Sequence, residues 1–130
     1  MSKLTAAFAH ARALPLFVGT VDAEVDDADP VPVTALEDLC AVVLHATNDA
    51  GTNPTLAAKV QHADAEDGDF EDVPGGAFEA LDDQDSLQVL TLNAAALKPW
   101  VKIYFGAPGG TDNPAYTAAA SLLGVDKVRG

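Results

Sequence analysis

Turn-forming residues divide this chain at short and fairly even intervals, and that spacing constrains its fold more than any other feature. Clusters rich in Gly, Pro, Asn and Asp occupy 26–32, 48–54, 64–68, 74–76, 82–86 and 106–114. The apolar runs between them predict strands at 16–21, 39–45, 55–62, 70–73, 87–92, 100–105 and 116–123. Short strands alternating with turns are typical of a β-sandwich or a β-barrel.

Composition favours the sandwich. Hydrophobic residues make up 48% of the 130 residues, but much of that share is Ala and aromatic residues are only 6%. Such a chain suits a thin core of small side chains between two closely packed sheets. We therefore predict an all-β fold, with one antiparallel β-sandwich domain at 16–130 behind an N-terminal arm at 1–15.

The pattern inside two predicted strands indicates which faces are covered. The strand at 39–45 is apolar on both faces, which predicts a central strand covered on both sides. The strand at 55–62 alternates between apolar and polar residues, so one of its faces should contact water.

The acidic stretch "KVQHADAEDGDFEDVPGGAFEAL" raises the question of a calcium site. An EF-hand loop aligned on Gly68 would place Ala63, Ala65, Asp67 and Pro74 at four ligand positions, and three of these have no carboxylate. The EF-hand interpretation therefore fails, although a looser cation site made by other acids of this stretch stays open.

A hairpin explains the same stretch more simply. Asp67 and Gly68 tolerate the positive φ that tight hairpin turns require, and Pro-Gly-Gly at 74–76 predicts a second turn. Consecutive acids at a solvated tip offer neither the burial nor the fixed separation that a glycosidase carboxylate pair needs.

No constellation of residues indicates catalysis, a cofactor or a metal. The single cysteine, Cys40, lies in the apolar run "LCAVVL" and is expected to be buried and inert. His45 and His62 fall near the ends of two predicted strands and are possible neighbours, but neither they nor His10 show zinc-ligand spacing. No G-x-S-x-G or phosphate-binding loop occurs, so we predict no enzyme, no cofactor and no metal site.

The net charge of −13 argues against direct binding to nucleic acid, because such a field repels phosphate backbones. No stretch approaches the ~18 apolar residues of a membrane span. The N-terminal segment is not a convincing signal peptide, because His10 and Arg12 interrupt its apolar run. We expect a protein that is made in the cytoplasm and binds neither nucleic acid nor membrane.

Two segments are candidates for partner binding. Lys98, Trp100, Lys102 and Tyr104 alternate along one predicted strand and form a basic and aromatic group in an acidic chain. Trp and Tyr beside cations are common interface anchors and also stack on sugars, although the same residues often do no more than cover a sheet.

The N-terminal arm is the second candidate. Leu4, Phe8 and Ala11 have helical spacing, but the segment is too short to form a stable helix alone. We expect the arm, with Leu4, Phe8 and Leu14 as contacts, to lie on the body or on a neighbouring subunit.

Several phrases resemble a known family. "VQHADAEDGDFEDVPGGAF", "AGTNPTLAAKVQH", "ALKPWVKIYF" and "NPAYTAAASLLG" are similar to the strand and turn phrases of small structural proteins encoded beside the head genes of tailed bacteriophages. Together they cover roughly 39–124. The departures are the Ala-rich core, the unusually acidic tip and the poorly matched arm.

That resemblance implies a jelly-roll-like sandwich on a virion: a capsid decoration (cement) protein or a minor head protein. The implied partner is the major capsid protein, the implied assembly a homo-oligomer with a trimer favoured, and the implied location the capsid surface after assembly in the host cytoplasm. A carbohydrate-binding β-sandwich module, on a virion or a cell surface, is the alternative. A small hydrolase ranks last.

Overall fold

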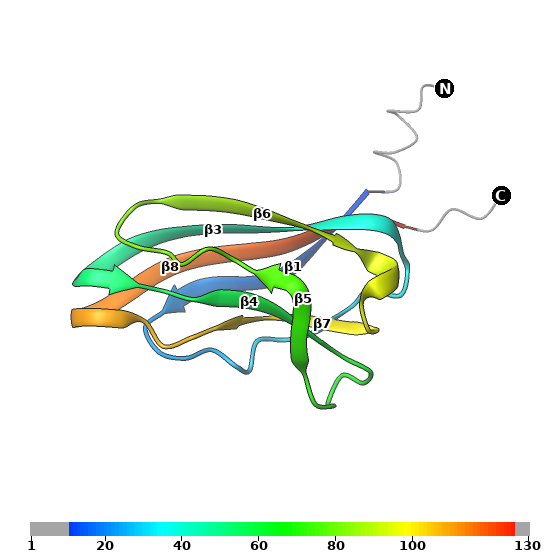
Figure 1. Ribbon diagram of the computed structural model, residues 1–130, viewed down its shortest axis with the longest axis horizontal. Coiled ribbons are helices and arrows are strands. Elements are labelled where there is room, and N and C mark those ends of the chain that lie inside the picture. The colour runs from blue at the N-terminus through cyan, green and yellow to red at the C-terminus, as the bar shows by residue number, and fades with distance from the viewer. Residues whose placement is uncertain (1–10, 127–130) are drawn as a thin grey trace, which may run out of the picture.

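The computed structural model describes residues 11–126 as two four-stranded antiparallel sheets that lie face to face (Figure 1). Sheet A has the strand order β1-β8-β3-β6 and sheet B the order β2-β7-β4-β5. The elements are β1 (Ala11–Val21), β2 (Val31–Pro32), β3 (Leu36–Thr55), β4 (Ala58–Ala63), β5 (Glu71–Ala77), β6 (Ser86–Asn93), the 3-10 turn η1 (Ala94–Ala96), β7 (Trp100–Phe105) and β8 (Gly109–Asp126).

This strand order is that of an eight-stranded jelly roll. Successive strands alternate between the two sheets, except for β4 and β5, which pair with each other as a hairpin in sheet B. The expected all-β, antiparallel, jelly-roll-like sandwich is confirmed.

Alternation along the strands builds the core between the sheets. In β7, Val101, Ile103 and Phe105 are fully buried, while the residues between them face outward. The ring of Phe105 lies 5.1 Å from the ring of Phe17 on β1, which joins the two sheets. Sheet A contributes small side chains such as Ala118 to the same layer, but most of the buried core residues are larger: Leu, Val, Ile, Phe and Tyr.

The longest strands run through the predicted turn at 48–54 and through most of the one at 106–114, of which only 106–108 connect two strands. The turn prediction is therefore wrong over 48–54 and 109–114. The segments 48–54 and 106–114 belong largely to the irregular paired ends of β3 and β8, where the register shifts several times. Gly51, with φ +110°, takes up one of these shifts, and a Cβ there would lie 2.7 Å from Cα of Pro114. Residues that favour positive φ here form bulges within a ladder instead of reversing the chain.

Sheet A also begins earlier than predicted, and one strand of sheet B was missed. Ala11 to Pro15, assigned to the arm from sequence, pair with β8, and Leu14 is partly buried against the core. Leu4 and Phe8 lie outside the described residues. β2 falls inside the predicted turn 26–32; it has two residues, one of them proline, which suits an edge strand.

The acidic hairpin is present, but its turns differ from the prediction. β4 and β5 pair at His62 and Glu71, and the backbone N–H of Gly68 donates to the carbonyl of Ala65 over 3.0 Å. Neither Asp67 nor Gly68 has a positive φ, because the longer loop reverses the chain without one. Pro74-Gly75-Gly76 forms a bulge inside β5, with Gly75 at φ +74°, and not a second turn.

Candidate binding surfaces

The outer face of sheet B gathers the aromatic and basic residues predicted from sequence. Trp100, Lys102 and Tyr104 project from β7 on the side opposite the core, as the alternation predicts. We call this the lysine–aromatic face, and it consists of Lys59, Gln61, Phe70, Trp100, Lys102 and Tyr104.

Two lysine ammonium groups lie over aromatic rings on this face. Nζ of Lys59 is 5.0 Å from the ring centroid of Tyr104, its Cα partner on the neighbouring strand. Nζ of Lys102 is 4.7 Å from the ring centroid of Phe70, which precedes β5. Contacts of this kind are electrostatically favourable, so they fix the side chains across three strands.

Carboxylates neutralise part of the basic charge. Nζ of Lys59 lies 2.9 Å from a carboxylate oxygen of Asp72, and Nε2 of Gln61 donates to the same carboxylate over 3.1 Å. The hydrogen bonds from Gln61 and Lys59 hold the pKa of Asp72 below its ordinary value. The face is therefore a network of paired charges and not a basic patch.

A second ion pair borders the face near the end of β4. Lys98 pairs closely with Glu71 and lies 3.9 Å from Asp64. The hydrogen bond between Lys98 and Glu71 lowers the pKa of Glu71 and raises the pKa of Lys98. The backbone N–H of Lys98 donates to Nδ1 of His62 over 3.1 Å, so this buried imidazole has a structural partner, as expected.

Tyr104 and Trp100 are the partly exposed anchors of the face. The hydroxyl of Tyr104 donates to the carboxylate of Glu24, and this hydrogen bond raises the tyrosine pKa. Trp100 is the first residue of β7, and its Cα partners on the two neighbouring strands are Pro32 of β2 and Ala63 of β4. The structure thus brings Trp100, Lys102 and Tyr104 together on one face. Lys98 precedes β7 and pairs with Glu71 beside the buried His62, so it lies at the border of this face.

The outer face of sheet A was not recognised from sequence. Five large hydrophobic side chains are exposed in the described part of the chain, and all lie here: Val18 (79%), Leu39 (63%), Leu87 (69%), Val89 (58%) and Leu123 (41%). The prediction that the strand at 39–45 is covered on both sides is therefore wrong. β3 is central in its sheet, but it is covered only on its inner side.

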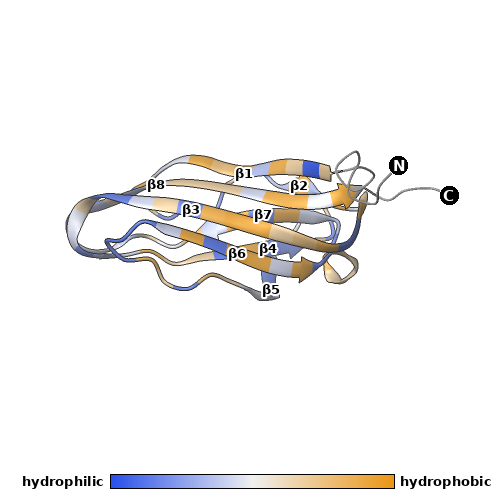
Figure 2. Ribbon diagram, turned by 90° about the horizontal axis from the view of Figure 1, so that it is seen from above, coloured by the Kyte–Doolittle hydropathy of each residue, from blue (hydrophilic) through white to orange (hydrophobic). Residues whose placement is uncertain are grey.

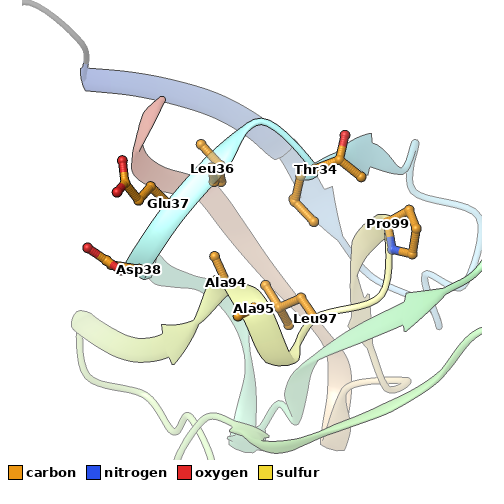
Figure 3. Close-up of a pocket in the computed structure, with 9 residues that line it drawn as sticks. Thr34, Leu36, Glu37, Asp38, Ala94, Ala95, Leu97 and Pro99 are labelled. Atoms are coloured by element: carbon orange, nitrogen blue, oxygen red, sulfur yellow. The ribbon is translucent and has the colours of Figure 1, made fainter. Parts of the chain in front are cut away.

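A hollow lies at one end of the sandwich, where the start of β3 approaches η1 (Figure 3). It holds about 380 Å³, and its lining is mainly apolar, with Leu36, Leu97 and Pro99 among the residues that form it. The carboxyl groups of Glu37 and Asp38 lie on the side of the view away from Pro99. No nucleophile and base converge in it, so it offers no reaction centre.

The other candidate groups do not assemble a site. His45 lies on the outer face of sheet A and His62 is buried in sheet B, so the idea that they are neighbours is wrong. Cys40 is buried, and burial raises its pKa. Within residues 11–126, no three His, Cys, Asp or Glu side chains are placed to hold a metal ion. No helix in that range is long and apolar enough to cross a membrane.

No family model and no curated protein matches this chain. One similar solved structure is the CBM22-1 xylan-binding domain of Paenibacillus barcinonensis Xyn10C, with 15% identity, a TM-score of 0.46 and coverage of 77% of this chain and 65% of that domain. Another is the N-terminal cellulose-binding domain of Cellulomonas fimi β-1,4-glucanase C, with 18% identity, a TM-score of 0.44 and coverage of 93% and 80%. These likenesses are too distant to carry an argument, and the fold assignment rests on the chain's own strand order.

Proposed function

We propose that this chain is a non-enzymatic virion structural protein that binds the outer surface of a phage capsid through its lysine–aromatic face. The observation that carries the proposal is the face itself: three aromatic residues and two lysines from neighbouring segments share one side of sheet B. The choice of a capsid as the partner rests on the resemblance to phage structural proteins. The same resemblance implies a jelly roll, which is the fold of this chain.

The face is pre-organised for contact. Lys59 is held by both Asp72 and the ring of Tyr104, and Lys98, at its border, is held by Glu71. Side chains that are already fixed lose less conformational entropy when a partner binds. Trp and Tyr are the residues most enriched among energetically important interface contacts, so Trp100 and Tyr104 are the proposed anchors.

The acidic tip fits an outward position on a particle. The loop between β4 and β5 projects from the sandwich (Figure 1), and its residues from Asp64 to Asp69 are exposed. Carboxylates displayed in this way repel other particles and stray nucleic acid. In this proposal the tip contributes solubility and no ligand contact.

The test uses phage heads assembled without this protein, from the major capsid protein that the proposal gives it as a partner. The purified chain should sediment with these heads up to a fixed ratio and should raise their resistance to heat. Trp100→Ala should weaken this binding while the circular dichroism spectrum stays unchanged. Wild-type protein that stays in the supernatant at every concentration would refute the proposal.

Carbohydrate binding is the second candidate, and the same face favours it. Trp100 and Tyr104 lie four residues apart on one side of β7, with the amide of Gln61 nearby, which is the combination of ring faces and polar groups that sugars use. Xylan and cellulose are named for the two similar structures, and for this chain a polysaccharide ligand rests on these residues alone.

Both candidate functions predict that Trp100 contributes to binding, so a Trp100 variant does not distinguish them. The choice of ligand does. Trp100 is the only tryptophan of the chain, so its fluorescence reports on the face directly. A change in this fluorescence with soluble xylan or a soluble cellulose derivative, with no binding to heads, would favour the carbohydrate-binding module. Binding to heads with no response to polysaccharide would favour the capsid protein.

A further inference from the structure

The outer face of sheet A differs from the rest of the surface in having no charged side chain over most of its area. Its outward residues form rows across the four strands: Pro15, Ser121, Val43 and Val89 in one row, then Val18, Ala119, His45 and Leu87 in the next. We call these eight residues the neutral face. None is Asp, Glu, Lys or Arg, although the chain has 20 Asp and Glu residues.

The exposed hydrophobic residues concentrate on and beside this face. Val18, Leu87 and Val89 are each more than half exposed within it, and Leu39 and Leu123 lie next to it on the same side. Figure 2 shows β1, β8, β3 and β6 side by side, with hydrophobic stretches along all four strands. An apolar patch of this extent on a soluble chain indicates a contact site.

We propose that the neutral face binds the neutral face of a second copy of this chain, so that two sandwiches associate through their β1-β8-β3-β6 sheets. Every copy has a net charge of −13, so two copies repel each other wherever their acidic surfaces meet. The neutral face is where two copies can approach without placing carboxylates against carboxylates. An uncharged surface also complements itself, as a two-fold contact requires.

The size of the sheet is sufficient for such a contact. Four strands ~4.8 Å apart, over the eight residues of β6 and the residues that pair alongside them, cover roughly 500 Å² in projection. This area takes in the neutral face and the outward rows next to it. This is close to the area that each partner buries in the smaller specific protein interfaces, about 600 Å². Sheets of two copies would then pack face to face as the two sheets within each sandwich do.

This contact is independent of the proposed function, because the lysine–aromatic face lies on the other sheet. It also closes at two copies, so it is a different contact from the trimer expected from the sequence. Capsid protein is the competing occupant of the neutral face, and the experiment separates it from a second copy.

The experiment is sedimentation velocity of the full chain over a range of concentrations, at low and at high salt. We expect a monomer–dimer equilibrium that shifts toward the dimer as salt is added, because salt screens the repulsion between acidic copies and leaves apolar contact intact. A monomer at both salt concentrations, up to about 1 mM protein, would overturn the proposal.

Two substitutions test whether the neutral face makes the contact. Val89→Asp on β6 should weaken dimerisation roughly 100-fold, because the contact is two-fold and each dimer then holds two buried like charges. Val18→Lys on β1 should also weaken it, although it lowers the repulsive net charge. Both positions are more than half exposed, so the monomers should fold, as circular dichroism would verify.

Ala107→Asp is the matched control, since it adds one negative charge in an exposed loop between β7 and β8. It should leave the dimer within about twofold of wild type, which the screening of exposed charges allows. A dimer that survives Val89→Asp and Val18→Lys would overturn the assignment of the contact to this face. So would a loss of head binding in these variants together with an unchanged oligomeric state, which would place capsid protein on the neutral face.

Discussion

The two outer faces of the sandwich are built from strands of the same fold but have opposite chemistry. On sheet B, Lys59 and Lys98 each pair with a carboxylate, and aromatic rings lie beneath lysine ammonium groups. On sheet A, the corresponding outward positions are Val, Ala, Ser, Leu and His, and Val18 and Leu87 remain largely exposed.

The difference shows that a single acidic chain can present two separate contact surfaces. Paired charges give a face directional contacts, which favour one partner and exclude others. An uncharged sheet face has few directional contacts, but it is suited to another surface of the same kind. In a chain with a net charge of −13, an uncharged sheet face is unexpected. The neutral face therefore marks sheet A as the side on which a contact is expected.

The largest expected effect comes from comparing two leucines of sheet A that lie on opposite sides of it. Leu44 is fully buried and Leu87 is 69% exposed. Leu44→Ala should lower the free energy of unfolding by about 2–5 kcal/mol. Leu87→Ala should change it by less than about 0.5 kcal/mol when the chain is dilute. Urea denaturation measures both, and equal losses would mean that the neutral face is covered within the monomer.

Binding to heads gives the next largest contrast. Trp100→Ala should weaken binding at least about tenfold, as expected for an aromatic anchor. Leu87→Ala should leave the affinity for heads unchanged, because Leu87 projects from the other sheet. Titration of heads with labelled protein measures both. The reverse pattern would exchange the roles of the two faces.

Acid sensitivity should be a property of the ion pair that borders the lysine–aromatic face. Lys98 lowers the pKa of Glu71 from its ordinary 4.5, so the pair stabilises the folded chain above that pH. This stability is lost as the pH falls through the lower, folded-state pKa. Wild type should therefore lose more stability than Glu71→Gln between about pH 7 and about pH 3. Identical losses in urea denaturation at the two pH values would contradict the ion pair.

The smallest effect concerns Tyr104. Its hydrogen bond to Glu24 raises its pKa above the ordinary 10.0, so Glu24→Gln should lower it. Tyr116 is the only other tyrosine of the chain, and a Tyr116→Phe background makes the phenolate absorbance specific to Tyr104. A titration curve that does not move in the double variant would remove Glu24 from the face.

The sequence predicts strands well where a single strand carries a strong alternation. β7 begins at Trp100 and ends at Phe105, as expected, because apolar and polar residues alternate without interruption there. A second local case is the Ala-rich segment just before Pro99, where Ala94–Ala96 form the 3-10 turn η1. Local patterns of this kind need no knowledge of distant residues.

Features that depend on distant residues were missed. Gly51 and its neighbours look like a turn in sequence, because a bulge in a long ladder uses the same residues as a chain reversal. The neutral face joins residues of four strands, from β1 to β8, whose register no local pattern reveals. The ion pairs of Lys59 and Lys98 likewise arise only when β4, β5 and β7 are side by side.

Cryo-electron microscopy of heads saturated with this protein tests most directly whether the two faces have separate partners. We expect one copy of each dimer to contact the shell through Trp100 and Tyr104 of sheet B, while its neutral face on sheet A meets a second copy that points away from the shell. A shell that contacts Val18, Val43 and Val89 instead would contradict this arrangement.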